Sequence, residues 1–155
     1  MRRFAVGLTA FLLLLGAATP PRAAAQLPPH AWLFGAWTGG LFPPPTQMTA
    51  AACLAQPVVI FTRDLVLRST LTELTYVQRE VATARATPAG VDFRFTPLAE
   101  PAGGGGPLGL SGMGRTIGFG CADPDELHVQ RQTENAITLP GCTDFPYPLV
   151  RCPAR

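Results

Sequence analysis

The chain has 155 residues, of which 47% are hydrophobic and 14% charged, and its formal net charge is +2. All 12 of its basic residues are arginines, which excludes Schiff-base lysine chemistry and a P-loop lysine. Three of these arginines precede residue 26, which leaves nine arginines against ten acidic residues in the rest. Such a near-neutral chain lacks the basic surface that binds a phosphate backbone, so nucleic acid is not an expected partner.

The N-terminal stretch has the three parts of a secretory signal peptide. Two arginines follow the initial Met, residues 4–18 form an apolar run, and Ala23–Ala25 supplies a small-residue cleavage site. The run is shorter than the roughly 20 apolar residues that cross a bilayer, which favours a cleaved signal over a membrane anchor. We therefore expect cleavage after Ala25, a periplasmic or secreted location without a permanent membrane span, and one domain over residues 26–155.

Residues 31–42 carry the first strand pattern. Leu33, Gly35, Trp37, Gly39 and Leu41 share one parity there, and three prolines follow directly. Because glycine disfavours a helix and aromatic side chains suit a pleated sheet, we expect a strand. Its glycines indicate a bend, a bulge or a close backbone approach, as occurs where a small barrel closes. We expect the preceding residues 26–30 to be extended and His30 to be solvated.

Two hairpins are predicted next. Residues 58–61 and 65–67 are short apolar runs on either side of Arg63-Asp64, which indicates a hairpin. Residues 71–87 are rich in β-forming residues and lead through a Pro-Ala-Gly turn into the alternating residues 91–95. This favours a long second hairpin. An amphipathic helix over 71–87 is the alternative, because several apolar residues also fall at helical spacing.

Glycine dominates residues 102–114, which we expect to form a flexible loop. The segments that follow are a strand, an acidic turn and two further strands, over residues 115–119, 123–126, 127–132 and 136–139. We expect residues 143–155, with two prolines before Cys152 and one after it, to be irregular. Together these segments predict an all-β fold, a small antiparallel β-barrel or sandwich of about seven or eight strands.

Four cysteines lie in the part expected to be exported, at Cys53, Cys121, Cys142 and Cys152. An even number in an oxidising compartment predicts two disulfides, with three possible pairings. We favour Cys142–Cys152 with Cys53–Cys121, since a terminal staple and a long-range tie would hold both irregular regions. No Cys-x-x-Cys spacing occurs and the chain has only two histidines, so we expect neither a metal site nor a cofactor.

Residues suited to catalysis are few. Ser69 and Ser111 are the only serines, and Met113 stands where a Gly-x-Ser-x-Gly elbow around Ser111 would need its last glycine. His128 alternates with apolar neighbours, so we expect it to face outward, and a general base or pH sensor there would need a partner. The acidic turn lacks the six or more oxygens of a calcium cage. We expect no catalytic residues and a protein that is not an enzyme.

Gly35-Ala36-Trp37 resembles the Gly-x-Trp motif that opens the first strand of lipocalin-like (calycin) barrels. The resemblance implies structural roles for Gly35 and Trp37, with the indole packed across a closed barrel end near an arginine of a late strand. Arg131 is the candidate for that arginine, because it shares the parity of the apolar residues in its predicted strand. Other small secreted barrels, including bacterial periplasmic proteinase-inhibitor barrels, also carry an early tryptophan.

A barrel of this kind suggests binding rather than catalysis. The first hypothesis is an exported barrel that binds a small apolar ligand or an envelope partner. The alternative is an inhibitor or protein-interaction module that reaches its partner with residues 26–32 or 103–114. Because side chains can fill an eight-stranded barrel, an open interior would favour a ligand and a filled one would direct attention to the loops.

Overall fold

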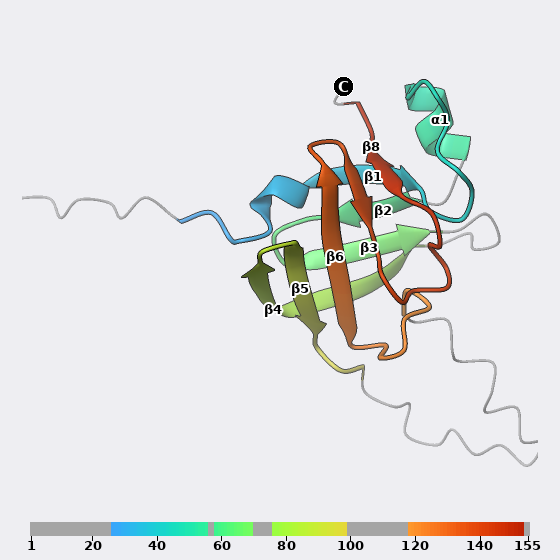
Figure 1. Ribbon diagram of the computed structural model, residues 1–155. Coiled ribbons are helices and arrows are strands. Elements are labelled where there is room, and N and C mark those ends of the chain that lie inside the picture. The colour runs from blue at the N-terminus through green and yellow to red at the C-terminus, as the bar shows by residue number, and fades with distance from the viewer. Residues whose placement is uncertain (1–25, 56–57, 70–75, 99–117, 154–155) are drawn as a thin grey trace, which may run out of the picture.

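The computed structural model describes residues 26–55, 58–69, 76–98 and 118–153. Within these ranges the chain forms a closed antiparallel barrel in which each strand pairs with the next and the last pairs with the first (Figure 1). The strands are β1 Gly35–Gly39, β2 Val58–Phe61, β3 Leu65–Ser69, β4 Val77–Thr87, β5 Gly90–Phe95, β6 Glu126–Thr133, β7 Ala136–Thr138 and β8 Leu149–Arg151. The predicted all-β barrel is confirmed.

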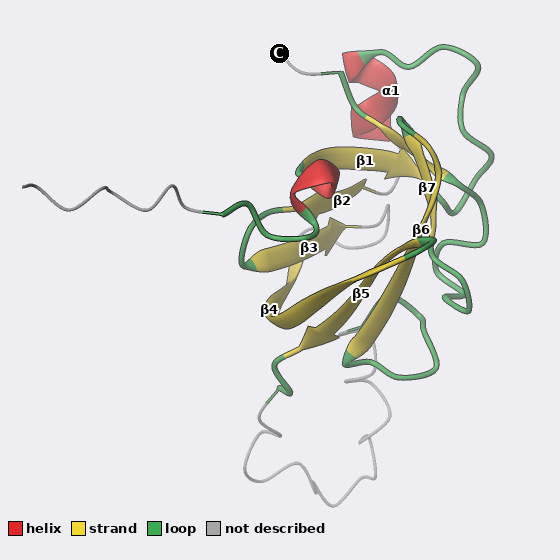
Figure 2. Ribbon diagram, turned by 60° about the vertical axis from the view of Figure 1, so that its left-hand side comes forward, coloured by secondary structure: helices red, strands yellow, loops and turns green. Residues whose placement is uncertain are grey.

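Two short helices lie outside the barrel wall. The 3-10 helix η1 Ala31–Leu33 precedes β1, and α1 Ala50–Ala55 follows it and lies beside it (Figure 2). One end of the barrel therefore carries η1 together with the β2–β3, β4–β5 and β6–β7 turns, and we call it the η1 end. The opposite end is covered by residues 118–125 and 140–148, and we call it the loop end.

Both predicted hairpins are present. In the β2–β3 turn, Thr62 Oγ1 donates to the carbonyl of Leu65 at 2.9 Å and accepts from its N–H at 3.0 Å. The β4–β5 turn is closed by the N–H of Gly90, which donates to Thr87 Oγ1 at 3.0 Å. A Cβ at Gly90 would lie 2.0 Å from the carbonyl oxygen of Val129, so only glycine fits beneath β6. The second hairpin begins at Val77, and residues 70–75 lie outside the described ranges.

Three local predictions are corrected. The first strand begins at Gly35 rather than at residue 31, because the N–H groups of Ala31 and Leu33 bond back to Pro28 and His30 and wind η1. The C-terminal segment is not wholly irregular, since β8 pairs with both β1 and β7 and closes the barrel. Phe119 lies between bends at Gly118 and Gly120 rather than in a strand, and residues 115–117 and the glycine-rich loop fall outside the described ranges.

Inward-facing side chains fill the barrel. Five aromatic rings form one column along its interior, with successive ring centroids 5.8 to 6.3 Å apart: Phe61, Phe93, Phe95, Phe119 and Phe145. Each ring in the column is at most 2% exposed, and Trp37, Leu33 and Leu149 pack into the same core at 0%. Each buried ring removes a large apolar area from water, so the column contributes strongly to the stability of the fold. The interior is thus a core rather than a ligand chamber.

The four cysteines form two disulfides, as predicted, but the expected pairing is wrong. The bonds are Cys53–Cys152 and Cys121–Cys142. Closure of the barrel by β8 brings Cys152 beside β1, where its N–H donates to the carbonyl of Ala36 at 2.8 Å, within reach of the α1 cysteine. At the loop end, the N–H of Thr143 donates to the carbonyl of Gly120 at 2.9 Å and aligns the other pair. Spatial closure, not spacing along the chain, sets the pairing.

Candidate functional site

Trp37 closes the η1 end of the core. Its side chain is completely buried and its Nε1–H donates to the carbonyl of Leu33 at 2.8 Å. The Arg151 guanidinium lies over the indole, with Cζ 4.3 Å from the ring centroid. Arg151 also donates to the carbonyls of Phe34 at 2.9 Å and Trp32 at 2.5 Å, which ties η1 to β8. This arrangement is a structural lock.

The arginine over Trp37 is therefore Arg151, and the choice of Arg131 was wrong. β6 extends beyond the barrel wall, and its pairing with β7 is irregular between Arg131 and Thr133. Arg131 comes before this irregularity and pairs with the fully buried Ile137, so it keeps the parity of Leu127 and Val129. It is nevertheless exposed, because it lies where β6 passes the η1 end of the core. Its guanidinium instead lies over the ring of Trp32, with Cζ 4.9 Å from the centroid.

Gly35 lies at the turn from η1 into β1. Its φ of +115° lets the chain turn from η1 into β1, a conformation that a residue with a Cβ rarely adopts. A Cβ there would lie 3.8 Å from Arg151 Nη1, so conformation rather than lack of space selects glycine.

Arg131 and Arg151 lie at the η1 end, and no carboxylate among the described residues is within ion-pair distance of either. Within the described ranges, Arg68, Arg79 and Arg94 each form an ion pair, whereas Arg131 and Arg151 form none. Desolvation by burial lowers the pKa of Arg151, and the positive charge of Arg131 lowers it further, while Glu134 raises it. The two guanidinium groups therefore repel each other, and the carboxylate of Glu134 partly offsets this effect on Arg151.

Two buried arginines hold the loop end in place. Arg68 on β3 and Arg79 on β4 are 2% and 1% exposed and point into the barrel. Arg68 Nη1 donates to Asp144 Oδ2 at 2.5 Å. Arg79 donates to the Asp125 carboxylate and to the carbonyl of Pro124 at 2.7 Å, and its Cζ lies 5.1 Å from the Phe95 centroid.

These pairs fasten the loops that carry Phe119 and Phe145 over the barrel mouth. The sequence offered a signal for both arginines, since each shares the parity of valines in its strand. Parity alone does not predict a buried arginine, because charged residues are rarely fully buried without a partner. The carboxylate partners of Arg68 and Arg79 lie 76 and 46 residues away in the sequence.

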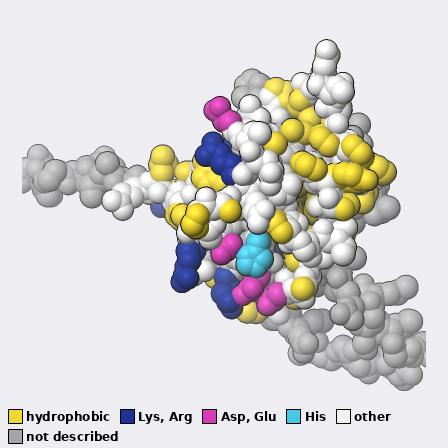
Figure 3. Space-filling model, viewed as in Figure 1, with side chains coloured by type: hydrophobic (Ala, Val, Ile, Leu, Met, Phe, Trp, Pro, Cys, Tyr) yellow, Lys and Arg dark blue, Asp and Glu magenta, His cyan; other side chains and the backbone are white. Residues whose placement is uncertain are grey.

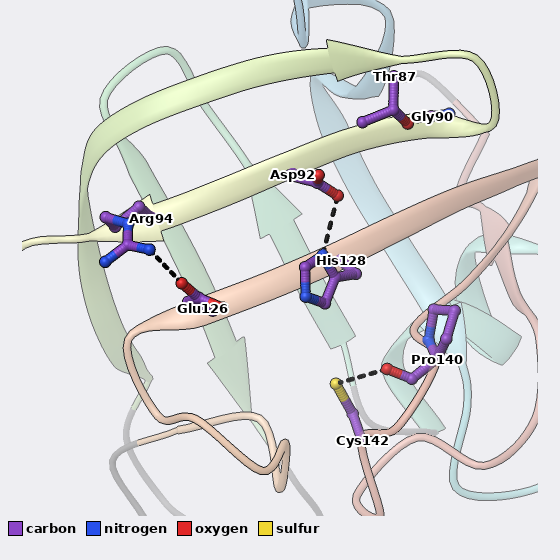
Figure 4. Close-up of polar contacts among 8 residues, drawn as sticks. All are labelled: Thr87, Gly90, Asp92, Arg94, Glu126, His128, Pro140 and Cys142. Atoms are coloured by element: carbon purple, nitrogen blue, oxygen red, sulfur yellow. Dashed lines mark hydrogen bonds and ion pairs between the residues drawn. The ribbon is translucent and has the colours of Figure 1, made fainter.

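The two histidines differ in environment. His128 faces outward, as expected, and its Nδ1 lies 2.8 Å from Asp92 Oδ1 on the neighbouring strand, beside the Arg94–Glu126 ion pair (Figure 4). Both members of the His128–Asp92 pair are about half exposed, so the pair resembles an ordinary surface ion pair.

Thiol chemistry requires a free cysteine. The described residues contain none, because all four cysteines are in disulfides.

His30 is buried rather than solvated, at 2% exposure. Its Nε2 lies 3.2 Å from the carbonyl of Thr62 and 3.0 Å from that of Arg63, and its ring packs edge-on against Phe34 and Phe93. This contact anchors the N-terminal segment on the β2–β3 turn. The N-terminal segment from His30 onward therefore belongs to the fold.

An exposed apolar surface adjoins the loop end. Here β1 and the segment before β8 meet, because the N–H of Tyr147 donates to the carbonyl of Gly40 at 2.7 Å and the N–H of Gly40 donates to the carbonyl of Pro148 at 3.3 Å. The residues that project from this junction are Leu41, Phe42, Pro43, Pro146 and Tyr147, which we call the apolar rim. Phe42 and Tyr147 are 48% and 43% exposed. Local sequence patterns do not reveal this surface, because it depends on the contact of Gly40 with residues 147 and 148.

A shallow hollow lies next to the apolar rim. Its volume is about 470 Å³, and it is lined by residues 138–143, Phe145 and Pro146. Figure 3 shows hydrophobic side chains gathered over β8 and the adjoining loops, whereas charged side chains and a histidine gather over β4 to β6. The visible face is thus divided into an apolar part and a charged part.

Comparison with protein-family models, with curated protein sequences and with solved structures finds no match to this chain. In the described ranges, no helix is long and apolar enough to span a membrane. No group of three or more potential metal ligands occurs in the same ranges.

Proposed function

We propose that this protein is a non-catalytic, exported β-barrel that binds a protein partner of the cell envelope through the apolar rim. The observation that carries the proposal is an exposed aromatic surface beside a hollow, on a barrel whose interior is filled by its own side chains. Two disulfides and a signal-like N-terminus support export to an oxidising compartment.

The chemistry of the rim indicates the chemistry of the partner. The rim residues are uncharged, and aromatic side chains such as Phe42 and Tyr147 are enriched at binding hot spots. A partner would therefore present an apolar, uncharged segment, with an anchor side chain that enters the hollow. The filled interior weighs against the hypothesis of a small apolar ligand within the barrel.

The experiment compares two double variants in the native host. Phe42→Ser with Tyr147→Ser removes the rim rings, while Tyr76→Ser with Leu98→Ser removes two comparably exposed apolar side chains elsewhere. Chemical cross-linking followed by mass spectrometry should show the same partner with the wild type and the control, and should lose it with the rim variant. Retention of that partner by the rim variant, or a wild type recovered only as an apo monomer, would contradict the proposal.

The likeness to lipocalin-like barrels is part of the same proposal. It is supported by the Gly-x-Trp motif and by the stack of Arg151 on Trp37 at the end of the barrel. Sequence relatives of this chain that keep the barrel but replace both members of that stack would count against a shared origin.

A further inference from the structure

Arg131 and Arg151 are both attached to Trp32, although they come from different strands. Arg131 on β6 lies over the Trp32 ring, and Arg151 on β8 donates to the Trp32 carbonyl. The N–H of Arg151 also donates to the carbonyl of Asn135 at 2.9 Å, which places the end of β8 at the β6–β7 turn. Two guanidinium groups therefore flank one tryptophan at the η1 end.

We propose that Arg131 and Arg151, with Trp32, form a binding site for an oxyanion: a carboxylate, phosphate or sulfate group. The proposal is independent of the apolar rim, which lies at the loop end. It rests on the contacts of the two arginines with Trp32 and on the absence, among the described residues, of a carboxylate within ion-pair distance of either.

The charges at this end make an anion favourable. Within the described ranges neither arginine has an acidic partner within ion-pair distance, and the two cations disfavour each other. Glu134 is close enough to influence Arg151 but does not pair with it. An anion between the guanidinium groups would replace this repulsion by two charge-assisted contacts.

The two arginines would act differently. Arg151 is fixed by its carbonyl contacts and its stack on Trp37, so it supplies a preorganised positive charge. Arg131 is exposed, and in the part of the chain that the structure describes its guanidinium contacts the Trp32 ring without an ion-pair partner, so its fork of N–H donors remains available to a ligand. The planar fork matches carboxylate and phosphate oxygens, which defines the chemical class of the ligand.

The test uses the full mature protein and the side-chain Nε–H signals of its arginines in NMR spectra. Sodium phosphate, sulfate and acetate are added separately, each against sodium chloride at matched ionic strength. We expect a saturable shift of the Arg131 and Arg151 signals with at least one oxyanion, and no comparable shift with chloride. Vesicles of phosphatidylcholine with and without phosphatidylglycerol distinguish a lipid headgroup from a free anion.

Arg131→Gln removes the exposed donor, and Arg85→Gln removes another exposed arginine, on β4, as the matched control. We expect Arg131→Gln to lower the affinity for the most tightly bound oxyanion at least 10-fold. Arg85→Gln should leave that affinity unchanged. A linear response that chloride reproduces, or equal affinity in Arg131→Gln and wild type, would overturn the proposal. Unchanged amide spectra away from Trp32 would establish that Arg131→Gln keeps its fold.

Discussion

The Arg151 guanidinium lies 4.3 Å from the centre of the Trp37 ring and simultaneously donates to two carbonyls of the segment that leads into β1. One side chain from the last strand thus secures the first strand, the 3-10 helix and the central tryptophan. The lock couples closure of the barrel to packing of its core.

Replacing Trp37 by Ala should lower the free energy of unfolding by about 3–5 kcal/mol, because the ring is fully buried.

Arg151→Gln should lower the free energy of unfolding by about 2–4 kcal/mol, since this variant loses a cation–π contact and charge-assisted bonds to two carbonyls. Arg131→Gln should cost only about 0.5–1 kcal/mol, the range for an exposed cation–π contact. Urea unfolding of the oxidised protein measures all three. Equal losses for the two arginine variants would show that Arg151 has no special role.

The buried Arg79–Asp125 pair makes a second prediction. Asp125→Ala leaves the guanidinium of a 1% exposed arginine with only carbonyl partners, and should destabilise the fold by about 1–3 kcal/mol. The carboxylate itself is 34% exposed, which keeps the loss below that of a fully buried pair.

Adding Arg79→Met to Asp125→Ala should recover part of that stability, because an apolar side chain of similar length no longer needs a counter-charge. A double-mutant cycle by urea unfolding measures the coupling between the two residues. Strictly additive losses would indicate that the ion pair does not hold the loop end.

The disulfide pairing has a direct check. Peptide mapping without reduction should recover Cys53 linked to Cys152 and Cys121 linked to Cys142. Replacing both members of the Cys121–Cys142 bridge by Ser should destabilise by about 3 kcal/mol, and replacing both members of the other bridge should destabilise by more. The difference follows from the sequence separations of 21 and 99 residues, because a longer closed loop restricts the unfolded chain more strongly. The reverse order of stabilities would contradict this.

Local patterns predicted most of the barrel wall. The alternation over residues 91–95 and 127–132 and the apolar runs over 58–61 and 65–67 became strands, because each pattern needs only its own side chains to reveal two faces. The strand β8 was not predicted, because it has only three residues, too few to show an alternating pattern, and prolines lie close on both sides. It exists because β1 and β7 offer it partners on both sides.

The site was less predictable for the same physical reason. Trp37 could be identified from its motif, but its covering arginine depends on where β6 leaves the barrel, which parity alone does not reveal. Exposure of Phe42 and Tyr147 also depends on a contact between distant segments at Gly40. Contacts across a closed barrel join residues that are far apart in the sequence. Residues whose environment depends on such contacts are therefore identified from the structure and not from local sequence patterns.

Gly40 offers the sharpest test of how the apolar rim is positioned. Its φ is +85°, and a Cβ there would lie 2.4 Å from Phe145 Cδ1, so Gly40→Ala must displace a ring of the core column as well as strain the backbone. Gly141→Ala is the matched control, because Gly141 has a φ of +76° but nothing within 4 Å of the added Cβ. We expect about 1–2 kcal/mol from backbone strain alone in Gly141→Ala, and a further 1–3 kcal/mol from overpacking in Gly40→Ala.

Urea unfolding gives the two stabilities, and amide exchange at Tyr147 reports whether its hydrogen bond to Gly40 persists. Exchange at Tyr147 should accelerate in Gly40→Ala and stay unchanged in Gly141→Ala. Equal stability losses with unchanged exchange would mean that the Gly40–Phe145 approach does not position the rim. A larger loss confined to Gly40→Ala would tie the exposed rings of the rim to the aromatic column beneath them, so that the position of the rim and the packing of the core depend on one contact.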